Sequence, residues 1–551
     1  MIKNFTKAVL GLLVAGAVPA FAQQYQVSID VAGDEYANKV LIDGSNVTLV
    51  GATNATPSAG AYDMMIMNGG LDGTFTGSVI QAGGAGNETA RAVSKFVSGN
   101  ATIAGASNSF STTPANIDDL FLITLTSGGG PAWVKVLGTD SLDRCFSVTE
   151  GNDNNVIIAG QTKQGDVAKF NGIVAKLDAA TGAVMWSKSV GTSYTNEVTY
   201  HVQKIQGVGY MVVGYSGVNV MGLNDCMAVL LNEDGTKNSA FIFGGPGDDD
   251  ARVFVDGGSG SFFIAGNTRN IGQGGGDAFL ARFSTVSFPT ITMDWFKTYG
   301  GTQDESLASA CANSSNSGVV LCGSTQSFGT GGEAFAISVD NNGVIQWSRV
   351  YGSTGSDIFQ GIAQDGSGGF VGGGYSNSFG GTANNAWVVR MDANGNSLCN
   401  NSGALFVEAT IANTSAYSSQ TDPSLADILS TDIVLTQRDV SSILSSGVNQ
   451  NPLTSNTLCT TVSVDENSAA NVVGIYPNPA GETLNFNFGV NAADAKGMVI
   501  YNALGAKVYE TTLSNVTSVF SADISNLANG MYTAVVFMNN TQVTAKFTVA
   551  K

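Results

Sequence analysis

Short apolar runs that end in glycine recur along the chain, and they predict β-strands. The first run reads TLVG, and the later copies read TIAG, IIAG, MVVG, FIAG, VLCG and VGGG. The glycines that end the seven runs are Gly51, Gly105, Gly160, Gly214, Gly266, Gly323 and Gly374. Their spacings of 54, 55, 54, 52, 57 and 51 residues are nearly constant, so the runs mark an internal repeat.

Other positions keep the same phase within the repeat. A polar residue opens an alternating apolar run about ten to fourteen residues after each glycine: Asp63, Asp119, Asn171, Asp225, Asp277, Glu333 and Asn385. A turn such as Asp340 to Gly343 follows, and then a strand that holds four of the five tryptophans: Trp133, Trp186, Trp295 and Trp347. The next strand begins near an acidic pair or its Asn or Ser equivalent: Asp34-Glu35, Asn87-Glu88, Asn196-Glu197, Asp249-Asp250, Asp304-Glu305 and Ser356-Asp357.

These positions divide each repeat into four short strands joined by tight turns, which predicts an all-β fold. A four-stranded meander cannot bury both of its faces alone, and seven of them do so as a seven-bladed β-propeller, which we assign to residues 23–399. A linear β-solenoid is the alternative, but its coils are shorter. By analogy with kelch-like blades, we expect the strand after the acidic pair to be innermost and the Trp strand outermost. The phase then places Tyr25 to Asp30 beside Asn385 to Met391, so that the N-terminal strand closes the last blade.

The first residues of the chain are typical of a secretory signal peptide. Lys3 and Lys7 precede an apolar run from Ala8 to Val18, which is shorter than the ~20 residues needed to span a membrane. Small residues at Ala20 and Ala22 then form a cleavage site. We therefore assign residues 1–22 to a signal peptide and expect the mature chain to leave the cytoplasm.

Composition and charge restrict the function further. The 551 residues include 24 Lys or Arg and 43 Asp or Glu, a formal net charge of −19, so we expect no nucleic-acid partner. Glycine contributes 70 residues and charged residues only 12%, which favours turns and sheets over solvated helices. The only histidine, His201, excludes a two-histidine metal site, and we expect it to be hydrogen-bonded or solvated in an inner strand.

The repeat resembles a known group of proteins. The unit W-x-K-x-Y-G-G…D-E…G-x-x-x-G-S-T…D-x-F, read mainly from Trp295 to Phe335, resembles the propeller repeats of secreted Bacteroidota proteins. Glu333 stands where that pattern usually has Asp. The resemblance implies the fold of about residues 25–399, and it implies little about function because such propellers serve varied roles.

The last part of the chain, residues 472–551, lacks the repeat and carries motifs of its own. Alternating strands separated by Pro, Asn and Gly turns predict a small Ig-like β-sandwich. The motifs are the start Tyr476-Pro477-Asn478-Pro479, VIYNALGAKVYE with Gly505, DISNLANGMYTAVV with Gly530 and Tyr532, and the terminal pair Lys546 and Lys551. Together they resemble the type A C-terminal sorting domain of the type IX secretion system. The resemblance implies export by that machinery to the cell surface of a Gram-negative bacterium, removal of the domain, and release or attachment to surface lipopolysaccharide.

A Ser/Thr/Asn-rich segment, residues 400–471, connects the two regions and contains the strand-like stretches ALFVEATIA and DIVLTQ. Cys399 closes the last repeat and Cys459 lies near the end of the segment, and we expect a disulfide between them, as export permits. The remaining cysteines are expected to be buried as small hydrophobic residues, with a Cys311–Cys322 bridge as the alternative; they are Cys145, Cys226, Cys311 and Cys322.

The recurring acidic pairs are the clearest candidates for chemistry, since two carboxylates can hydrolyse a glycosidic bond. They recur in nearly every repeat, however, and catalysis needs one asymmetric pair. We therefore expect them to cap turns and to bond the amides at strand starts. Calcium is the alternative, with its best candidate site at Asp248, Asp249 and Asp250, and no other cofactor is indicated.

With no assembled catalytic set, the sequence favours a secreted or cell-surface propeller that binds an extracellular glycan or protein. The alternative is a secreted polysaccharide hydrolase or lyase that acts through carboxylates at the mouth of the channel. A purely structural envelope component is a third hypothesis, and it predicts no soluble ligand.

Overall fold

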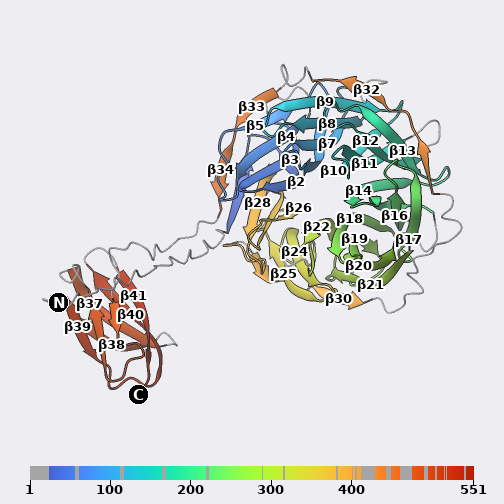
Figure 1. Cartoon of the computed structure of the whole chain (residues 1–551). Helices are drawn as coiled ribbons and strands as arrows, with labels where there is room; N and C mark the ends of the chain where they lie inside the picture. The colour runs from blue at the N-terminus through green and yellow to red at the C-terminus, as the bar shows by residue number, and fades with distance from the viewer. Residues whose placement is uncertain are drawn as a thin grey trace, which may run out of the picture. The chain divides into compact units, whose positions relative to one another are not determined.

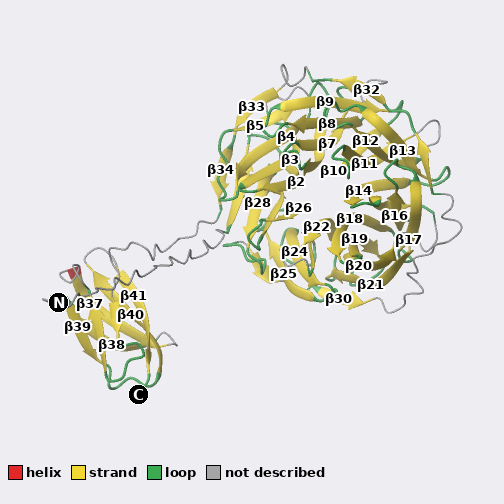
Figure 2. Ribbon diagram, in the orientation of Figure 1, coloured by secondary structure: helices red, strands yellow, loops and turns green. Residues whose placement is uncertain are grey.

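The computed structural model of the chain describes residues 24–55, 61–111, 117–163, 169–218, 223–287, 290–313, 317–379, 383–399, 401–403, 406–410, 428–441, 448–458, 474–488, 494–502, 506–513, 516, 518–538 and 542–551. The chain divides into two compact units, Met1–Thr461 and Val462–Lys551. The predicted signal peptide, residues 1–22, lies outside the described residues. The described residues form strands and no α-helix, which confirms the all-β prediction (Figure 2). Among them we therefore find no helix that could cross a membrane.

Seven antiparallel sheets, each built from four strands of the repeat region, make up the described part of the first unit. In chain order the strands are β2 (Glu35–Asp43), β3 (Asn46–Thr53), β4 (Asp63–Gly70) and β5 (Ser78–Ala82); β6 (Glu88–Lys95), β7 (Ala101–Ser107), β8 (Asp119–Leu125) and β9 (Pro131–Gly138); β10 (Asp143–Glu150), β11 (Val156–Lys163), β12 (Phe170–Leu177) and β13 (Val184–Gly191); β14 (Glu197–Ile205), β15 (Gly209–Ser216), β16 (Asp225–Leu231) and β17 (Lys237–Phe243); β18 (Asp249–Gly258), β19 (Ser261–Arg269), β20 (Gly276–Ser287) and β21 (Thr290–Gly300); β22 (Glu305–Ala312), β23 (Gly318–Thr325), β24 (Glu333–Asp340) and β25 (Ile345–Tyr351); and β26 (Asp357–Gln364), β27 (Phe370–Ser376), β28 (Asn385–Met391) and β1 (Tyr25–Asp30).

The sheets lie around a common centre, with the first strand of each nearest to it (Figure 1). β2 contacts β6 and β26, and the first strands of the other sheets contact one another in the same succession, so their contacts form a cycle. β1 pairs antiparallel with β28, from Tyr25 opposite Arg390 to Ile29 opposite Ala386. This is the pairing that the phase of the repeats predicts. Each sheet is open, and the arrangement is compatible with a β-propeller.

A β-bulge in the first strand of every sheet explains the repeated glycine. In the first of these sheets the register shifts between Ala37 and Lys39, so that Asn38 is an extra residue. Gly51 lies on the adjacent strand, where a Cβ atom would collide with the carbonyl oxygen of Tyr36. The glycines in the same relation to a bulge are Gly105, Gly160, Gly214, Gly266, Gly323 and Gly374. Close approach of two backbones therefore requires glycine at this position.

The tryptophan column joins neighbouring sheets. The indole Nε1 of Trp133 donates a hydrogen bond to the carbonyl of Ala179, 3.0 Å away, in the β12–β13 turn of the next sheet. Trp186, Trp295 and Trp347 donate in the same way to the corresponding turns. These four tryptophans therefore pack between neighbouring units of the repeat.

The connecting segment covers the outer edges of the sheets. Its strands are β29 (Asn401–Gly403), β30 (Val407–Thr410), β31 (Leu429–Asp432), β32 (Thr436–Asp439), β33 (Val448–Pro452) and β34 (Thr454–Thr457). They pair with β25, β21, β13, β9, β5 and β1, in that order, so the described segment runs around the unit against the chain order of the sheets. The β14–β17 sheet has four strands among the described residues. Pairing of this kind satisfies edge groups that could otherwise recruit another chain.

The cysteines divide as the sequence predicts. Cys399 is disulfide-bonded, and its Sγ lies 3.4 Å from the carbonyl oxygen of Leu458. The predicted partner, Cys459, lies outside the described residues, so that pairing stays a prediction. Cys145, Cys226 and Cys322 are free and buried, and Cys311 is free and half-buried, which excludes a Cys311–Cys322 bridge in this structure.

The second unit consists of two antiparallel sheets that contribute to one hydrophobic core. One sheet contains β35 (Gly474–Tyr476), β36 (Thr483–Asn487) and β39 (Val519–Asp523). The other contains β37 (Ala495–Asn502), β38 (Lys507–Thr512), β40 (Gly530–Met538) and β41 (Gln542–Val549). Alternate residues such as Leu484, Phe486, Ala534 and Val536 point into the core, as the alternating pattern predicts.

Candidate functional site

A buried carboxyl group opens the first strand of every sheet, and its partners show a structural role. The seven residues are Glu35, Glu88, Asp143, Glu197, Asp249, Glu305 and Asp357. Glu305 accepts a hydrogen bond from the amide of Gly301 at 2.7 Å and another from the hydroxyl of Thr325 at 2.6 Å. Each of the other six accepts a backbone amide from the loop that precedes its strand. The predicted bonding of strand-start amides is confirmed.

These acids are close to a second carboxyl or amide side chain that opens a third strand. A Cβ atom at Gly300 would collide with the carboxyl groups of both Asp277 and Glu305, which places the two acids side by side. Burial first, and then the charge of Glu305, raise the pKa of Asp277 to about 7. Burial also raises the pKa of Glu35 to about 7. Burial and the neighbouring negative charge thus favour the protonated form of Asp277.

The calcium candidates Asp248, Asp249 and Asp250 have separate partners. Asp248 accepts a hydrogen bond from Asn224 at 2.8 Å, and Asp250 binds the guanidinium of Arg252 at 2.6 Å. Asp249 is buried and accepts the amide of Gly245 at 2.6 Å. Among the described residues, no group of three or more His, Cys, Asp or Glu side chains is placed to hold a metal ion. Asp249, not Asp250, is the repeat equivalent of Glu305, which shifts the predicted acidic pair by one residue.

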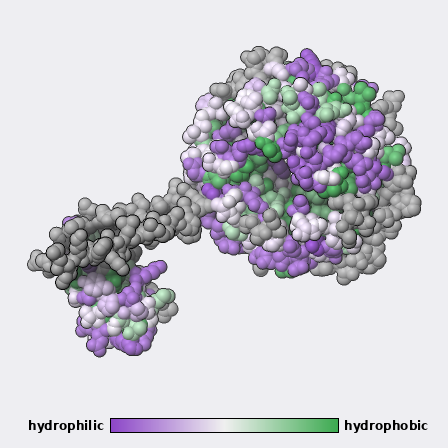
Figure 3. Space-filling view, in the orientation of Figure 1, coloured by the Kyte–Doolittle hydropathy of each residue, from purple (hydrophilic) through white to green (hydrophobic). Residues whose placement is uncertain are grey.

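A central cavity of about 310 Å³ is lined by the bulged residues of the first strands. The bulge residue is the third after the buried acid in each sheet: Asn38, Arg91, Phe146, Tyr200, Arg252, Ala308 and Gln360. Figure 3 shows a hollow near the middle of this face of the unit, with hydrophilic side chains over much of its surroundings. Unlike the glycines and the acids, the residues at this position differ from sheet to sheet, so they are not part of the repeated framework.

His201 lies at this cavity, on an inner strand as predicted. Its Nδ1 accepts the backbone amide of Phe254 at 3.3 Å. Burial, together with the positive charge of Lys39, lowers the pKa of His201 to about 3, so the imidazole is neutral at pH 7. The side chain is hydrogen-bonded, in agreement with the sequence prediction.

Sequence reasoning did not single out the other cavity residues. Lys39, Arg91 and Arg252 belong to three different repeats and share no motif with one another. For Arg91 and Arg252 the available signal was the fixed position three residues after the buried acid, combined with the variety of residues found there; Lys39 follows the bulge residue Asn38 and lacks that signal. This pattern indicates a binding site only once the structure shows that the bulge residues line the central cavity.

The motifs of the second unit meet at the terminal strand. Asn478 accepts the amide of Thr548 at 2.9 Å, and Ala480 bonds with the backbone of β41. The peptide bonds before Pro477 and Pro479 are cis, and Tyr476 is half exposed. The sequence stretch that opens the unit therefore docks on the stretch that ends it.

The other motif residues surround the same end of the chain. Lys551 donates from Nζ to the carbonyl of Leu527 at 2.7 Å, and its amide donates to Asn529 at 2.8 Å. Tyr532 donates to the carbonyl of Ala528 at 2.8 Å in the same loop, just before Gly530 opens β40. Lys546 is exposed on β41, and Gly505 lies outside the described residues.

Comparison with known proteins identifies this second unit. Residues 474–550 match the family described as the secretion system C-terminal sorting domain. No curated protein sequence matches the chain. The protein therefore carries a sorting domain of the type IX secretion system, interacts with that machinery, and is a secreted, cell-surface protein of Bacteroidota.

Proposed function

We propose that the first unit is a seven-bladed β-propeller that the sorting domain delivers to the cell surface, where its central cavity binds an extracellular ligand. Support for the propeller comes from the cyclic contacts of the first strands and from the pairing of β1 with β28. The observation that carries the binding role is the contrast between repeated and unrepeated positions. The same residue types recur at the seven glycine positions and at the seven buried-acid positions, whereas the residue type at the seven bulge positions differs from sheet to sheet.

A binding role agrees better with the carboxyl groups than catalysis does. The acids that recur in the sequence are buried and bonded to amides and hydroxyls. No Asp or Glu occurs among the described residues that line the central cavity. A hydrolase of the kind considered above needs two carboxyl groups on either side of the scissile bond.

The test uses the protein purified after secretion by the producing bacterium. It is applied to arrays of bacterial and host glycans and to extracellular matrix proteins, and the release of soluble sugar is measured in parallel. We expect binding without turnover. Depolymerisation of a bound polysaccharide would instead establish the hydrolase or lyase alternative, and binding to none of these materials would refute the proposal.

We propose further that the second unit is removed at the surface, and that the first unit is then released or attached to lipopolysaccharide. The division of the chain into two compact units supports this, because cleavage of the chain between residues 461 and 474 leaves each hydrophobic core intact. Mass spectrometry of the surface-exposed protein is expected to find no peptides from residues 474–551. Recovery of these peptides from the mature surface protein would contradict removal.

A further inference from the structure

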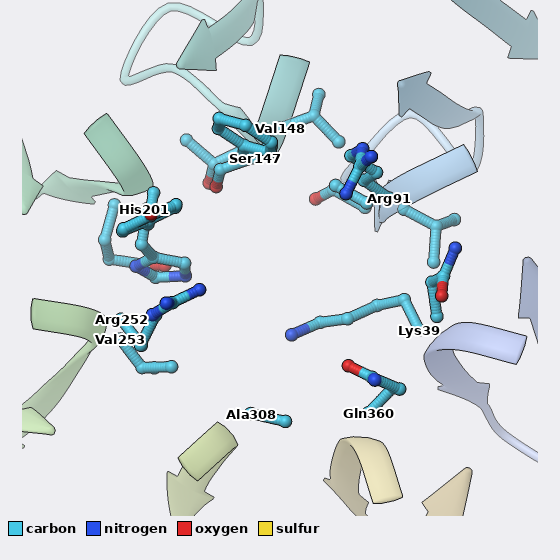
Figure 4. Close-up of a pocket in the computed structure, with 17 residues that line it drawn as sticks. Lys39, Arg91, Ser147, Val148, His201, Arg252, Val253, Ala308 and Gln360 are labelled. Atoms are coloured by element: carbon cyan, nitrogen blue, oxygen red, sulfur yellow. The ribbon is translucent and has the colours of Figure 1, made fainter. Parts of the chain in front are cut away.

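The central cavity gathers cations in a protein whose net charge is strongly negative. Lys39, Arg91 and Arg252 come from β2, β6 and β18, and all three line the cavity. Figure 4 shows the side chains of Lys39 and Arg252 reaching toward the middle of the cavity from different sides. The formal net charge of the chain is −19, so this concentration of positive charge does not follow from composition.

Aromatic rings hold the two guanidinium groups. The guanidinium carbon of Arg252 lies 4.1 Å from the centre of the Tyr200 ring, and that of Arg91 lies 5.4 Å from the centre of the Phe146 ring. Such contacts orient a guanidinium without neutralising its charge. The N–H groups at the edge of the Arg91 guanidinium plane stay available to an acceptor, whereas Asp250 occupies one edge of the Arg252 guanidinium.

The carboxylates near the cavity leave two of the three cations without an ion pair, although the charge of Asp118 also acts on Arg91. Asp250 forms a two-bond ion pair with Arg252, at 2.6 and 2.9 Å. Asp118 binds Arg144, and Glu150 lies 3.3 Å from Lys204. Among the described residues, Lys39 has its hydrogen bond with Ser309 Oγ at 3.0 Å and no ion pair, and Arg91 has no ion pair.

The electrostatic cost of this arrangement is reflected in lowered pKa values for Lys39 and Arg91. Burial lowers the pKa of Lys39. Burial, and then the charge of Arg144, lower the pKa of Arg91. A bound anion would offset both effects, because an opposite charge favours the protonated form of each group.

The lining also includes six residues with hydroxyl or amide side chains, together with apolar residues such as Val93, Val148 and Val253. Ser94, Ser147, Thr149, Asn38, Gln203 and Gln360 present hydroxyl and amide groups to the cavity. Its volume of about 310 Å³ is at the lower end of the ~300–1,000 Å³ typical of small-molecule sites. Asn38 and Ser147 are also bonded within the protein, and a hydroxylated ligand can form hydrogen bonds with the hydroxyl and amide groups that line the cavity.

We propose that the central cavity binds a small hydroxylated ligand that carries an oxyanion, held by Lys39, Arg91 and Arg252. The inference rests on the proposed binding function and assigns its ligand class. A carboxylate or sulfate accepts two parallel bonds from a guanidinium and a third from the lysine ammonium. The oxyanion can belong to an acidic sugar or to a free inorganic anion, and the test separates these two sources.

The test is calorimetric titration of the protein purified after secretion with D-galacturonate, D-galactose, inorganic sulfate and inorganic phosphate. Galacturonate and galactose form a matched pair that differs in the anionic group. We expect galacturonate to bind and galactose to bind at least about tenfold more weakly, with affinity falling as salt is raised. If sulfate or phosphate binds as tightly as galacturonate does, the site is assigned to a free oxyanion, and this result also supports the proposal.

Variants place the anion in the cavity. R91Q and K39Q each keep a polar side chain of similar length, and each is expected to reduce the affinity at least about tenfold. R438Q, at an exposed arginine on β32, is the control and is expected to leave the affinity unchanged. Circular dichroism melting checks that all variants are folded.

Two results overturn the inference in distinguishable ways. Binding of neutral ligands with no preference for anions, unaffected by R91Q and K39Q, refutes the oxyanion site and leaves the proposed binding function intact. A secreted protein that binds neither these probes nor any glycan or protein on the arrays refutes both.

Discussion

Asp249 offers a quantitative test of the structural role of the buried acids. Its side chain is 1% exposed, and its carboxylate accepts the amide of Gly245 at 2.6 Å. Burial raises its pKa from 3.8 to about 6, with a smaller contribution from the neighbouring Asp225, against the opposing effect of the hydrogen bonds. The folded protein therefore binds this proton more tightly than the unfolded chain does.

The sign of the pH dependence follows from that difference. Stability from this group is complete below pH 4 and is lost as the pH rises through about 6, because the folded state then holds a buried charge. A difference of about two pKa units corresponds to ~3 kcal/mol at pH 8. Asp249→Asn keeps an acceptor for Gly245 and removes the ionisation. Between pH 4 and pH 8 the ionisation of Asp249 lowers the free energy of unfolding of the wild type. In Asp249→Asn this contribution is absent, so we expect the decrease over the same pH range to be smaller by ~2–3 kcal/mol.

Urea unfolding of the full-length protein, followed by tryptophan fluorescence at several pH values, measures this difference. Asp256→Asn on the same strand is the control, because Asp256 is exposed, and its pH profile is expected to match the wild type. An Asp249→Asn profile parallel to that of the wild type would show that Asp249 does not titrate in this range and would refute the reasoning.

Three further predictions concern export of the protein, closure of the first unit by β1, and the disulfide bond of Cys399. Deleting Gly474 to Lys551 is expected to leave the protein in the periplasm, as measured by cell fractionation, and normal surface delivery would contradict the role given to the sorting domain. A mature chain that starts at Gly33 lacks β1, whose Val27 and Ile29 are fully buried, and it is expected to aggregate or to lose cooperative unfolding in calorimetry; an unchanged transition would argue against closure by β1. The predicted Cys399–Cys459 bond closes a loop of about 60 residues, so Cys399→Ser is expected to lower the free energy of unfolding by ~4 kcal/mol in urea, whereas an unaltered midpoint would rule out this contribution.

The framework of the first unit was predictable because each repeated residue answers a repeated physical constraint. Gly51 and its equivalents recur because a bulge brings the backbone of the inner strand too close for a Cβ atom. Glu305 and its equivalents recur because the loop before every first strand has an amide that needs an acceptor, and at Glu305 the hydroxyl of Thr325 on the neighbouring strand needs one too. Trp133 recurs as Trp186, Trp295 and Trp347 because each indole bonds the next turn.

The candidate site was not predictable by the same means. Arg91 and Arg252 occupy the bulge position, where Ala308 and Gln360 also occur, so no repeat pattern marks them. Their convergence depends on contacts between sheets that are distant in sequence. The outer strands were difficult for a different reason: the residues of β31, β32 and β34 are mostly exposed and polar, and the edge they cover, not their own pattern, makes them strands.

The measurement that tests the account most directly is ligand binding by a protein whose central cavity is filled. Ala308 has the bulge position of its sheet, and Phe146 and Tyr200 have the same position in two other sheets, so the framework accepts a large side chain there. Ala308→Trp is therefore expected to unfold at the wild-type urea concentration and to lose binding of the ligand identified on the arrays. Wild-type affinity in the folded Ala308→Trp variant would show that the ligand binds elsewhere and would contradict the assignment of the central cavity as the binding site.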